Sequence, residues 1–143
     1  MKDKRDNIST AELKERIAAH GMKCTSQRIA IYNAMLQLRH PSAEEVYHSI
    51  ENENPSISLS TVYNSLETFA NNKLIGKLMT RDGKKRYCGK PEPHAHLYYE
   101  DSGELIDYFD PSLQECIAGY FEINSIPDFE INDVQIIITG KRC

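Results

Sequence analysis

The chain has 143 residues, which is enough for one medium domain or two very small ones. Its 40% hydrophobic and 27% charged residues are typical of a globular protein with a buried core, so disorder and collagen-like structure are disfavoured. No apolar run approaches the roughly 20 residues of a membrane helix, and no apolar stretch follows the charged N-terminus as in a secretory signal. The sequence therefore predicts a cytoplasmic protein with no membrane partner.

Charge is distributed unevenly along the chain. The net charge of −4 argues by itself against a nucleic-acid ligand, because such proteins usually have a basic balance. Residues 1–87, however, carry 14 basic and 10 acidic groups, whereas residues 88–143 carry 3 and 11. This asymmetry predicts two domains with different functions, at 1–88 and 94–143, joined by a proline-containing linker at 89–93. A surface loop inside one domain is the alternative.

Four helices are expected in the first part. Ser9 and Glu12 form a capping box that begins a helix, and Gly21 ends it. A second helix spans about 25–38, and a further capping-box pattern at residues 42–45 begins the third. Ser58 caps a fourth helix, whose apolar face consists of Val62, Leu66, Phe69 and Ala70. The opposite face carries Ser60, Thr61, Tyr63, Asn64 and Glu67.

A basic hairpin follows these helices. Strand-like runs at 74–80 and 85–88 flank Asp82-Gly83, a strong hairpin signal. Helices followed by such a hairpin predict a winged helix-turn-helix, with the fourth helix in the major groove and the wing along the DNA backbone. The expected base-reading side chains are Ser60, Thr61, Tyr63 and Asn64, and the expected phosphate contacts are Arg81, Lys84, Lys85 and Arg86. A merely solvated hairpin tip is the alternative for the wing.

The second part reads as a small α/β unit, which makes the fold class α+β overall. Strands are expected at 96–99, 104–108 and 130–139. Asp110 and Pro111 begin a helix that reaches about Phe121 and is expected to bury Leu113, Ile117 and Phe121. About 50 residues are marginal for independent stability, so we expect a homodimer that covers the apolar strand face. Two-fold symmetry also suits palindromic operator DNA.

Metal-ligand residue types gather near the linker. His94 and His96 have the i, i+2 spacing that points both side chains to one side of a strand, and Asp107 lies on the expected partner strand. Cys88 and His40 are further candidate ligands from the first domain. Imidazole suits iron, manganese and zinc, a thiolate favours zinc, and a carboxylate favours harder ions.

Three alternatives to a regulatory metal site remain open at this point. The histidines are ordinary surface residues, or the protein binds DNA without metal control. As a third alternative, His94, His96 and Asp107 form the two-His-one-carboxylate triad of a non-haem iron oxygenase.

Several stretches together resemble the ferric uptake regulator (Fur) superfamily over residues 20–140. They are the segments at 21–28, 40–47, 60–66, 86–87, 94–96 and 103–108. The resemblance implies an N-terminal winged-helix domain, a C-terminal α/β dimerisation domain and one regulatory divalent metal per chain at the hinge. It implies a repressor and not an enzyme, and Lys23 in the first segment is counted among the expected DNA contacts.

Two positions resemble the peroxide-sensing branch of that family, PerR. Asn64 and Asp107 stand where iron-responsive members typically carry Arg and Glu. The branch implies His40, His94, His96 and Asp107 as ligands of Fe²⁺ or Mn²⁺, and oxidation of His40 or His94 under oxidative stress. Cys88 stands where the branch has an Asp, and is similar to a ligand of the zinc-responsive branch, Zur. Cys88 is then a ligand or a third oxidation-sensitive group, and zinc- or iron-responsive repression is the alternative function.

A structural zinc is not expected. Most family members hold one with two CxxC pairs, but this chain has no CxxC pair among its four cysteines. Tyr99 and Ser102 replace the first pair, and only Cys143 remains near the second. The sequence thus predicts no tetrathiolate site, with Tyr98 and Tyr99 filling the space.

Overall fold

The computed structural model describes residues 8–143, which form two compact units. The first unit ends at Pro91 and the second begins at Glu92, a division that falls within the expected linker at 89–93. Among the described residues, no helix is both long and apolar enough to cross a membrane.

The first unit is a winged helix-turn-helix, as predicted. Its four helices are α1 (Thr10–Ala19), α2 (Ser26–Gln37), α3 (Ala43–Ile50) and α4 (Leu59–Asn71). The antiparallel wing consists of β1 (Gly76–Met79) and β2 (Lys85–Cys88). Ser9, Ser42 and Ser58 each accept a hydrogen bond from the backbone N–H three residues later, so the three predicted serine caps are confirmed.

The core of this unit lies between the helices and the wing. Val62, Leu66 and Phe69 of α4 are fully buried, which confirms the predicted apolar face. The Phe69 ring meets Tyr32 of α2 edge to face, with 5.7 Å between ring centroids. Tyr87 of β2 is also fully buried and belongs to the same cluster. The outward face of α4 is thereby fixed relative to the wing.

The wing turns at the predicted Asp82-Gly83 pair. Gly83 has φ of +79°, a left-handed conformation that a side chain would strain. The Asp82 carboxylate accepts the Lys84 backbone N–H at 3.1 Å and a hydrogen bond from the Thr80 hydroxyl. The turn is thus stabilised by its own side chains.

The cap of α4 gives a first testable prediction. Ser58 Oγ accepts the Thr61 backbone N–H at 3.1 Å, so Ser58→Ala leaves that N–H without its capping partner. We expect the free energy of unfolding to fall by about 1 kcal/mol in urea denaturation. The exposed Ser56 in the preceding loop provides the matched control, because Ser56→Ala should leave the unfolding midpoint unchanged. Equal midpoints for the two variants would contradict the capping role.

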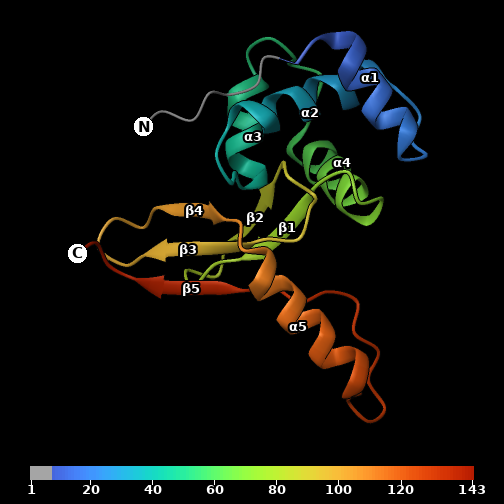
Figure 1. Ribbon diagram of the computed structural model, residues 1–143. Helices are drawn as coiled ribbons and strands as arrows, with labels where there is room; N and C mark the ends of the chain where they lie inside the picture. Colours follow the sequence, from blue (N-terminus) through green and yellow to red (C-terminus); the bar gives the residue numbers. More distant parts are fainter. Residues whose placement is uncertain (1–7) are drawn as a thin grey trace. The chain divides into compact units, whose positions relative to one another are not determined.

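The second unit consists of a three-stranded sheet and one helix. Its elements are β3 (Ala95–Tyr99), β4 (Leu105–Tyr108), α5 (Pro111–Ile123) and β5 (Ile137–Gly140). β3 lies in the middle, antiparallel to β4 and parallel to β5 (Figure 1). The Asp110 carboxylate accepts the Leu113 N–H at 3.2 Å, which confirms the predicted cap of α5.

Two expectations for this unit were wrong. Leu113, Ile117 and Phe121 were expected to be buried, but no residue of α5 is buried. Figure 1 shows the reason, since α5 runs away from the end of the sheet rather than across its face. The last strand was expected at 130–139, yet β5 spans Ile137–Gly140. In the parallel register that places His96 opposite Ile137, residues 130–135 would lie beyond the start of β3 and have no strand to pair with.

The C-terminal strand is attached to the β3–β4 turn. Glu100 donates its backbone N–H to the Gly140 carbonyl at 2.8 Å. The Arg142 guanidinium lies 4.6 Å from the centroid of the Tyr99 ring and forms an ion pair with Glu104. Tyr99 therefore contacts the C-terminal segment through Arg142, and its role in filling the space of a structural zinc site stays a prediction.

Candidate functional site

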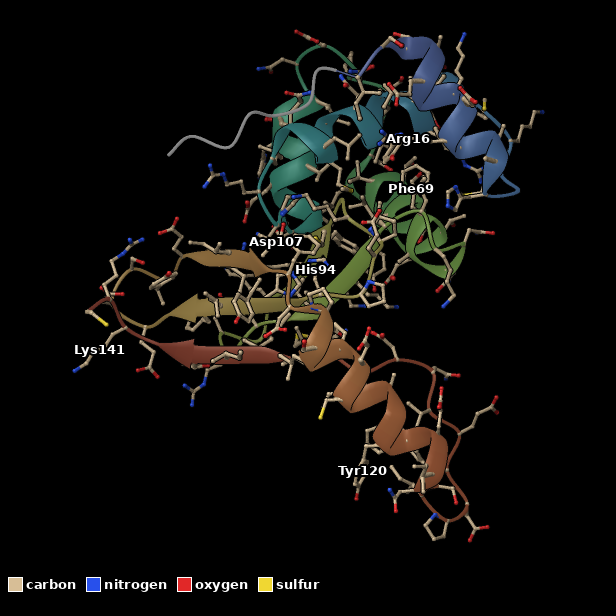
Figure 2. The ribbon with its side chains drawn as sticks, viewed as in Figure 1. Arg16, Phe69, His94, Asp107, Tyr120 and Lys141 are labelled. Atoms are coloured by element: carbon tan, nitrogen blue, oxygen red, sulfur yellow. The ribbon has the colours of Figure 1, made fainter. Side chains whose placement is uncertain are left out.

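Three of the predicted ligands come together at the β3–β4 pair, with His94 directly before β3. His96 and Asp107 are directly opposed in the antiparallel register. Asp107 Oδ1 lies 3.0 Å from His94 Nε2 and 3.2 Å from His96 Nε2, and the two imidazole rings have centroids 4.5 Å apart. Figure 2 shows His94 and Asp107 side by side at this end of the strands. The predicted convergence of these side chains is confirmed within the second unit.

The contacts of His94 suit a metal ligand. Its Nδ1 lies 2.6 Å from the Glu92 carbonyl oxygen, while its Nε2 faces the Asp107 carboxylate. A neutral imidazole has only one N–H, so it cannot donate to both oxygens at once. A hydrogen bond from Nδ1–H to the carbonyl leaves the Nε2 lone pair for a cation, an arrangement typical of metal-binding histidines. The Phe109 ring stacks on His94 at 4.7 Å and holds its plane.

The first unit supplies a second set of ligand atoms. A ring nitrogen of His40 and Sγ of Cys88 lie within 4.8 Å of each other. The Pro41 carbonyl accepts the Tyr87 N–H at 2.9 Å, which places the end of β2 beside the loop after α2. The Arg86 guanidinium donates to the His40 carbonyl at 3.1 Å and adds a second link. The five predicted ligands thus occur as one group in each unit.

The expected base-reading face is displayed by α4. Ser60, Tyr63 and Asn64 are exposed, with 42% of Tyr63 accessible. Thr61 is half-buried, and its hydroxyl lies 2.9 Å from Ser58 Oγ in the helix cap. Among the expected basic contacts, the exposed side chains are Lys23, Arg81 and Lys84.

Arg86 has extensive partners within the protein. Besides the His40 carbonyl, its guanidinium contacts Glu45 Oε1 at 3.3 Å and Asp82 Oδ2 at 3.6 Å. It therefore links the start of α3, the loop after α2 and the wing turn. Its contact with DNA stays a prediction.

Sequence reasoning missed the role of Glu67, which it placed on the solvated face of α4. The carboxylate accepts hydrogen bonds from Lys85 at 2.5 Å and Lys77 at 3.2 Å, one from each wing strand. The Lys85 ammonium also donates to the Tyr63 hydroxyl at 3.3 Å. The sequence indicated only that Glu67 follows Tyr63 by four residues and so shares its helix face, which does not reveal the two lysine partners.

The pKa of Glu67 reflects these contacts. Burial disfavours its charged form, but the hydrogen bonds from Lys85 and Lys77 outweigh burial and lower its pKa. The partner effect appears on Lys85, whose pKa the Glu67 hydrogen bond raises. Burial raises the pKa of Tyr87, so this phenol stays neutral beside the cluster.

A pH dependence of stability follows from the lowered pKa. The stabilisation by ionised Glu67 should be fully present above its ordinary pKa of about 4.3 and should be lost as pH falls through the lower folded value. We expect wild type to exceed Glu67→Gln in unfolding free energy by about 1 kcal/mol at pH 6. This difference should shrink progressively below pH 4 in urea titrations. A difference that stays constant between pH 6 and pH 3 would contradict the ionic contribution.

Comparison with known proteins identifies the family. The model of the ferric uptake regulator family matches residues 19–139. The peroxide-responsive repressor PerR of Staphylococcus epidermidis is 32% identical over 140 residues, covering 92% of this chain and 90% of the relative. Among solved structures, a zinc-bound manganese uptake regulator is 31% identical with a TM-score of 0.63, covering 92% of this chain and 98% of its own. The Campylobacter jejuni peroxide stress regulator is 26% identical with a TM-score of 0.66, covering 92% and 93%.

These matches span both units and agree with the winged helix and the ligand groups. Members of this family are transcription regulators that bind DNA and divalent metals and work as dimers, so the oxygenase alternative is excluded. The chain belongs to the ferric uptake regulator family and is a metal-dependent transcription regulator.

Proposed function

We propose that this protein is a peroxide-sensing repressor of the PerR type, which binds palindromic operator DNA as a metal-loaded homodimer. The observation that carries the proposal is the convergence of His94 and His96 on Asp107. An Asp at this position resembles the peroxide-sensing branch, since iron-responsive members typically carry Glu there. The 32% identity to the peroxide-responsive repressor of Staphylococcus epidermidis supports the same branch.

The ligand groups of the two units would hold one divalent ion per chain. His94, His96 and Asp107 supply two imidazoles and a carboxylate, a donor set that suits Fe²⁺ or Mn²⁺. His40 and Cys88 supply the ligands of the first unit. If ligands from both units hold the metal, the metal stabilises the DNA-binding form relative to the form that does not bind DNA. The size of this stabilisation is set by how much more tightly the DNA-binding form holds the metal.

Apolar side chains of the second unit support a homodimer. Eight of the eleven large hydrophobic residues that are exposed among the described residues belong to this unit. The most exposed are Tyr120, Ile123 and Phe129, at 58%, 85% and 64%. This concentration of exposed apolar side chains in one unit supports a protein interface there. In a two-fold dimer, two copies of α4 would read the two halves of a palindrome.

Cys88 favours a second candidate function. Its thiol lies beside His40, and a thiolate selects zinc over harder ions. A repressor that responds to zinc would use Cys88, His94 and His96 as its sensing ligands. The similar manganese uptake regulator was solved with zinc bound, which shows that a relative accepts this ion.

Metal analysis and mass spectrometry separate the two functions. Protein purified without oxygen should contain about one Fe²⁺ or Mn²⁺ per chain. On addition of hydrogen peroxide to the Fe²⁺ form, one oxygen atom should be inserted into the imidazole of His40 or His94, with water as the other product. Bound iron supplies the peroxide chemistry, and the modified imidazole no longer binds the metal well. Zinc at one per chain without histidine oxidation would overturn the peroxide proposal in favour of the zinc alternative.

A further inference from the structure

The Glu67 carboxylate connects the base-reading helix to both strands of the wing. It accepts hydrogen bonds from Lys77 on β1 and from Lys85 on β2, and its side chain is only 18% exposed. The donors lie 10 and 18 residues further along the chain. A single side chain of α4 thus fixes the distance between the helix and the wing.

The same cluster orients Tyr63, an expected base contact. Lys85 Nζ donates to the Tyr63 hydroxyl at 3.3 Å and lies 5.5 Å from the centroid of its ring. Tyr63 remains 42% exposed, so its ring is held by Lys85 but still faces solvent. Since Glu67 holds Lys85, it acts on Tyr63 through that lysine.

Glu67 also limits what the two lysines can do. Lysines free on a DNA-binding surface attract any phosphate and therefore strengthen binding to every sequence equally. Lys85 directs its ammonium to Glu67 and Tyr63, and Lys77 directs its ammonium to the same carboxylate. An acidic residue on a DNA-reading helix would otherwise repel the backbone, but here two cations offset its charge.

We propose that Glu67 is a positioning residue that sets the specificity of this regulator for its operator. It holds the wing and Tyr63 in the geometry that reads bases, and it withholds Lys77 and Lys85 from indiscriminate phosphate contacts. This inference rests on the proposed role of α4 as the base-reading helix.

Glu67→Gln is the central variant, because glutamine keeps the size of the side chain and removes its charge. The Mn²⁺-loaded full-length protein would first select an operator duplex from a randomised pool. Affinities for that duplex and for poly(dI-dC) would then be measured against salt. We expect the ratio of operator to poly(dI-dC) affinity to fall at least about tenfold, because losing the readout of a single base pair typically costs a factor of about this order or more. The salt slope on poly(dI-dC) should steepen by about 1 to 2, as two lysines become available to phosphates.

Two further variants make the test specific. Glu53→Gln removes the same charge from an exposed loop position and should leave the selectivity ratio unchanged. Glu67→Gln combined with Lys85→Gln should return the salt slope toward the wild-type value but should not restore selectivity. If Glu67→Gln matches Glu53→Gln in both selectivity and salt slope, the inference is overturned.

A measurement on the free protein separates this inference from the proposed function. Urea denaturation would be measured for Glu67→Gln, for Lys85→Gln and for the double variant that combines them. We expect their effects on the free energy of unfolding not to be additive, since the two side chains interact directly. Additive effects would overturn the positioning role even if DNA binding proceeds as proposed. Non-additive effects together with no selective DNA binding by wild type would locate the failure in the proposed function, and would overturn the specificity role as well.

Discussion

His94→Ala should abolish metal-dependent DNA binding while the protein stays folded. His94 places its Nε2 beside Asp107 and its Nδ1 beside the Glu92 carbonyl, so alanine removes a ligand that is already oriented. Removing a residue that only hydrogen-bonds to a metal ligand lowers metal affinity by up to about 100-fold. Removing the ligand itself should therefore lower it by at least about that much. Anaerobic Mn²⁺ titration measures the affinity, and a gel-shift with the selected operator measures the consequence.

His48→Ala is the matched control for this prediction. His48 lies on α3 with a 67% exposed side chain, and its Nδ1 lies 3.6 Å from Glu51 Oε1. The control should bind metal and DNA as wild type does. Asp107→Asn provides a second, nearly isosteric test, since the amide keeps the shape of the side chain and loses the charge that attracts a cation. Wild-type metal affinity in both His94→Ala and Asp107→Asn would remove the basis of the metal site.

Local signals account for the parts of the fold that were predicted correctly. The caps Ser9, Ser42 and Ser58 accept hydrogen bonds from backbone groups only three residues away. Gly83 adopts the left-handed turn conformation that its lack of a side chain permits. The opposition of His96 and Asp107 also follows from short-range pairing, because a hairpin fixes the register of its own strands. Such features depend on few residues and can be inferred from sequence alone.

The features that sequence reasoning missed depend on distant partners. Glu67 looked like part of a solvated helix face, because nothing local indicates that Lys77 and Lys85 reach it from the wing. The burial expected for α5 was wrong for a related reason. An amphipathic pattern shows that a helix has an apolar face, but not whether that face is covered by the same chain.

The overall acidity of the chain is similarly misleading about DNA. Its excess of acidic residues lies almost entirely in residues 88–143, whereas the winged-helix unit has a basic balance. Ion pairs also occupy part of its basic side chains, because Glu67 contacts Lys85 and Glu45 contacts Arg86. We therefore expect weak binding of the metal-free protein to DNA, with affinity arising from geometry more than from charge.

Tyr120→Glu combined with Ile123→Glu should convert the protein from a dimer to a monomer. The two residues lie one turn apart on α5 and are 58% and 85% exposed, so the substitutions should not disturb the fold of a single chain. Figure 2 shows the Tyr120 side chain on this helix. Within a dimer interface the same carboxylates would lose their hydration, at a cost of several kcal/mol each. Sedimentation equilibrium at micromolar concentration measures the mass, and far-UV circular dichroism checks the fold.

The DNA affinity of this double variant should fall by at least about 100-fold, because a monomer loses the effective concentration that joins two half-sites. Met79→Glu is the matched control for the mass, since Met79 is an equally apolar side chain, 50% exposed, but lies on β1 of the first unit. That variant should remain a dimer. If the double variant also remains a dimer, the exposed face of α5 cannot be the interface that the apolar surface of the second unit suggests. The exposed apolar residues of α5 would then contact some other partner. A dimer that reads a palindrome would have to form through the three-stranded sheet instead.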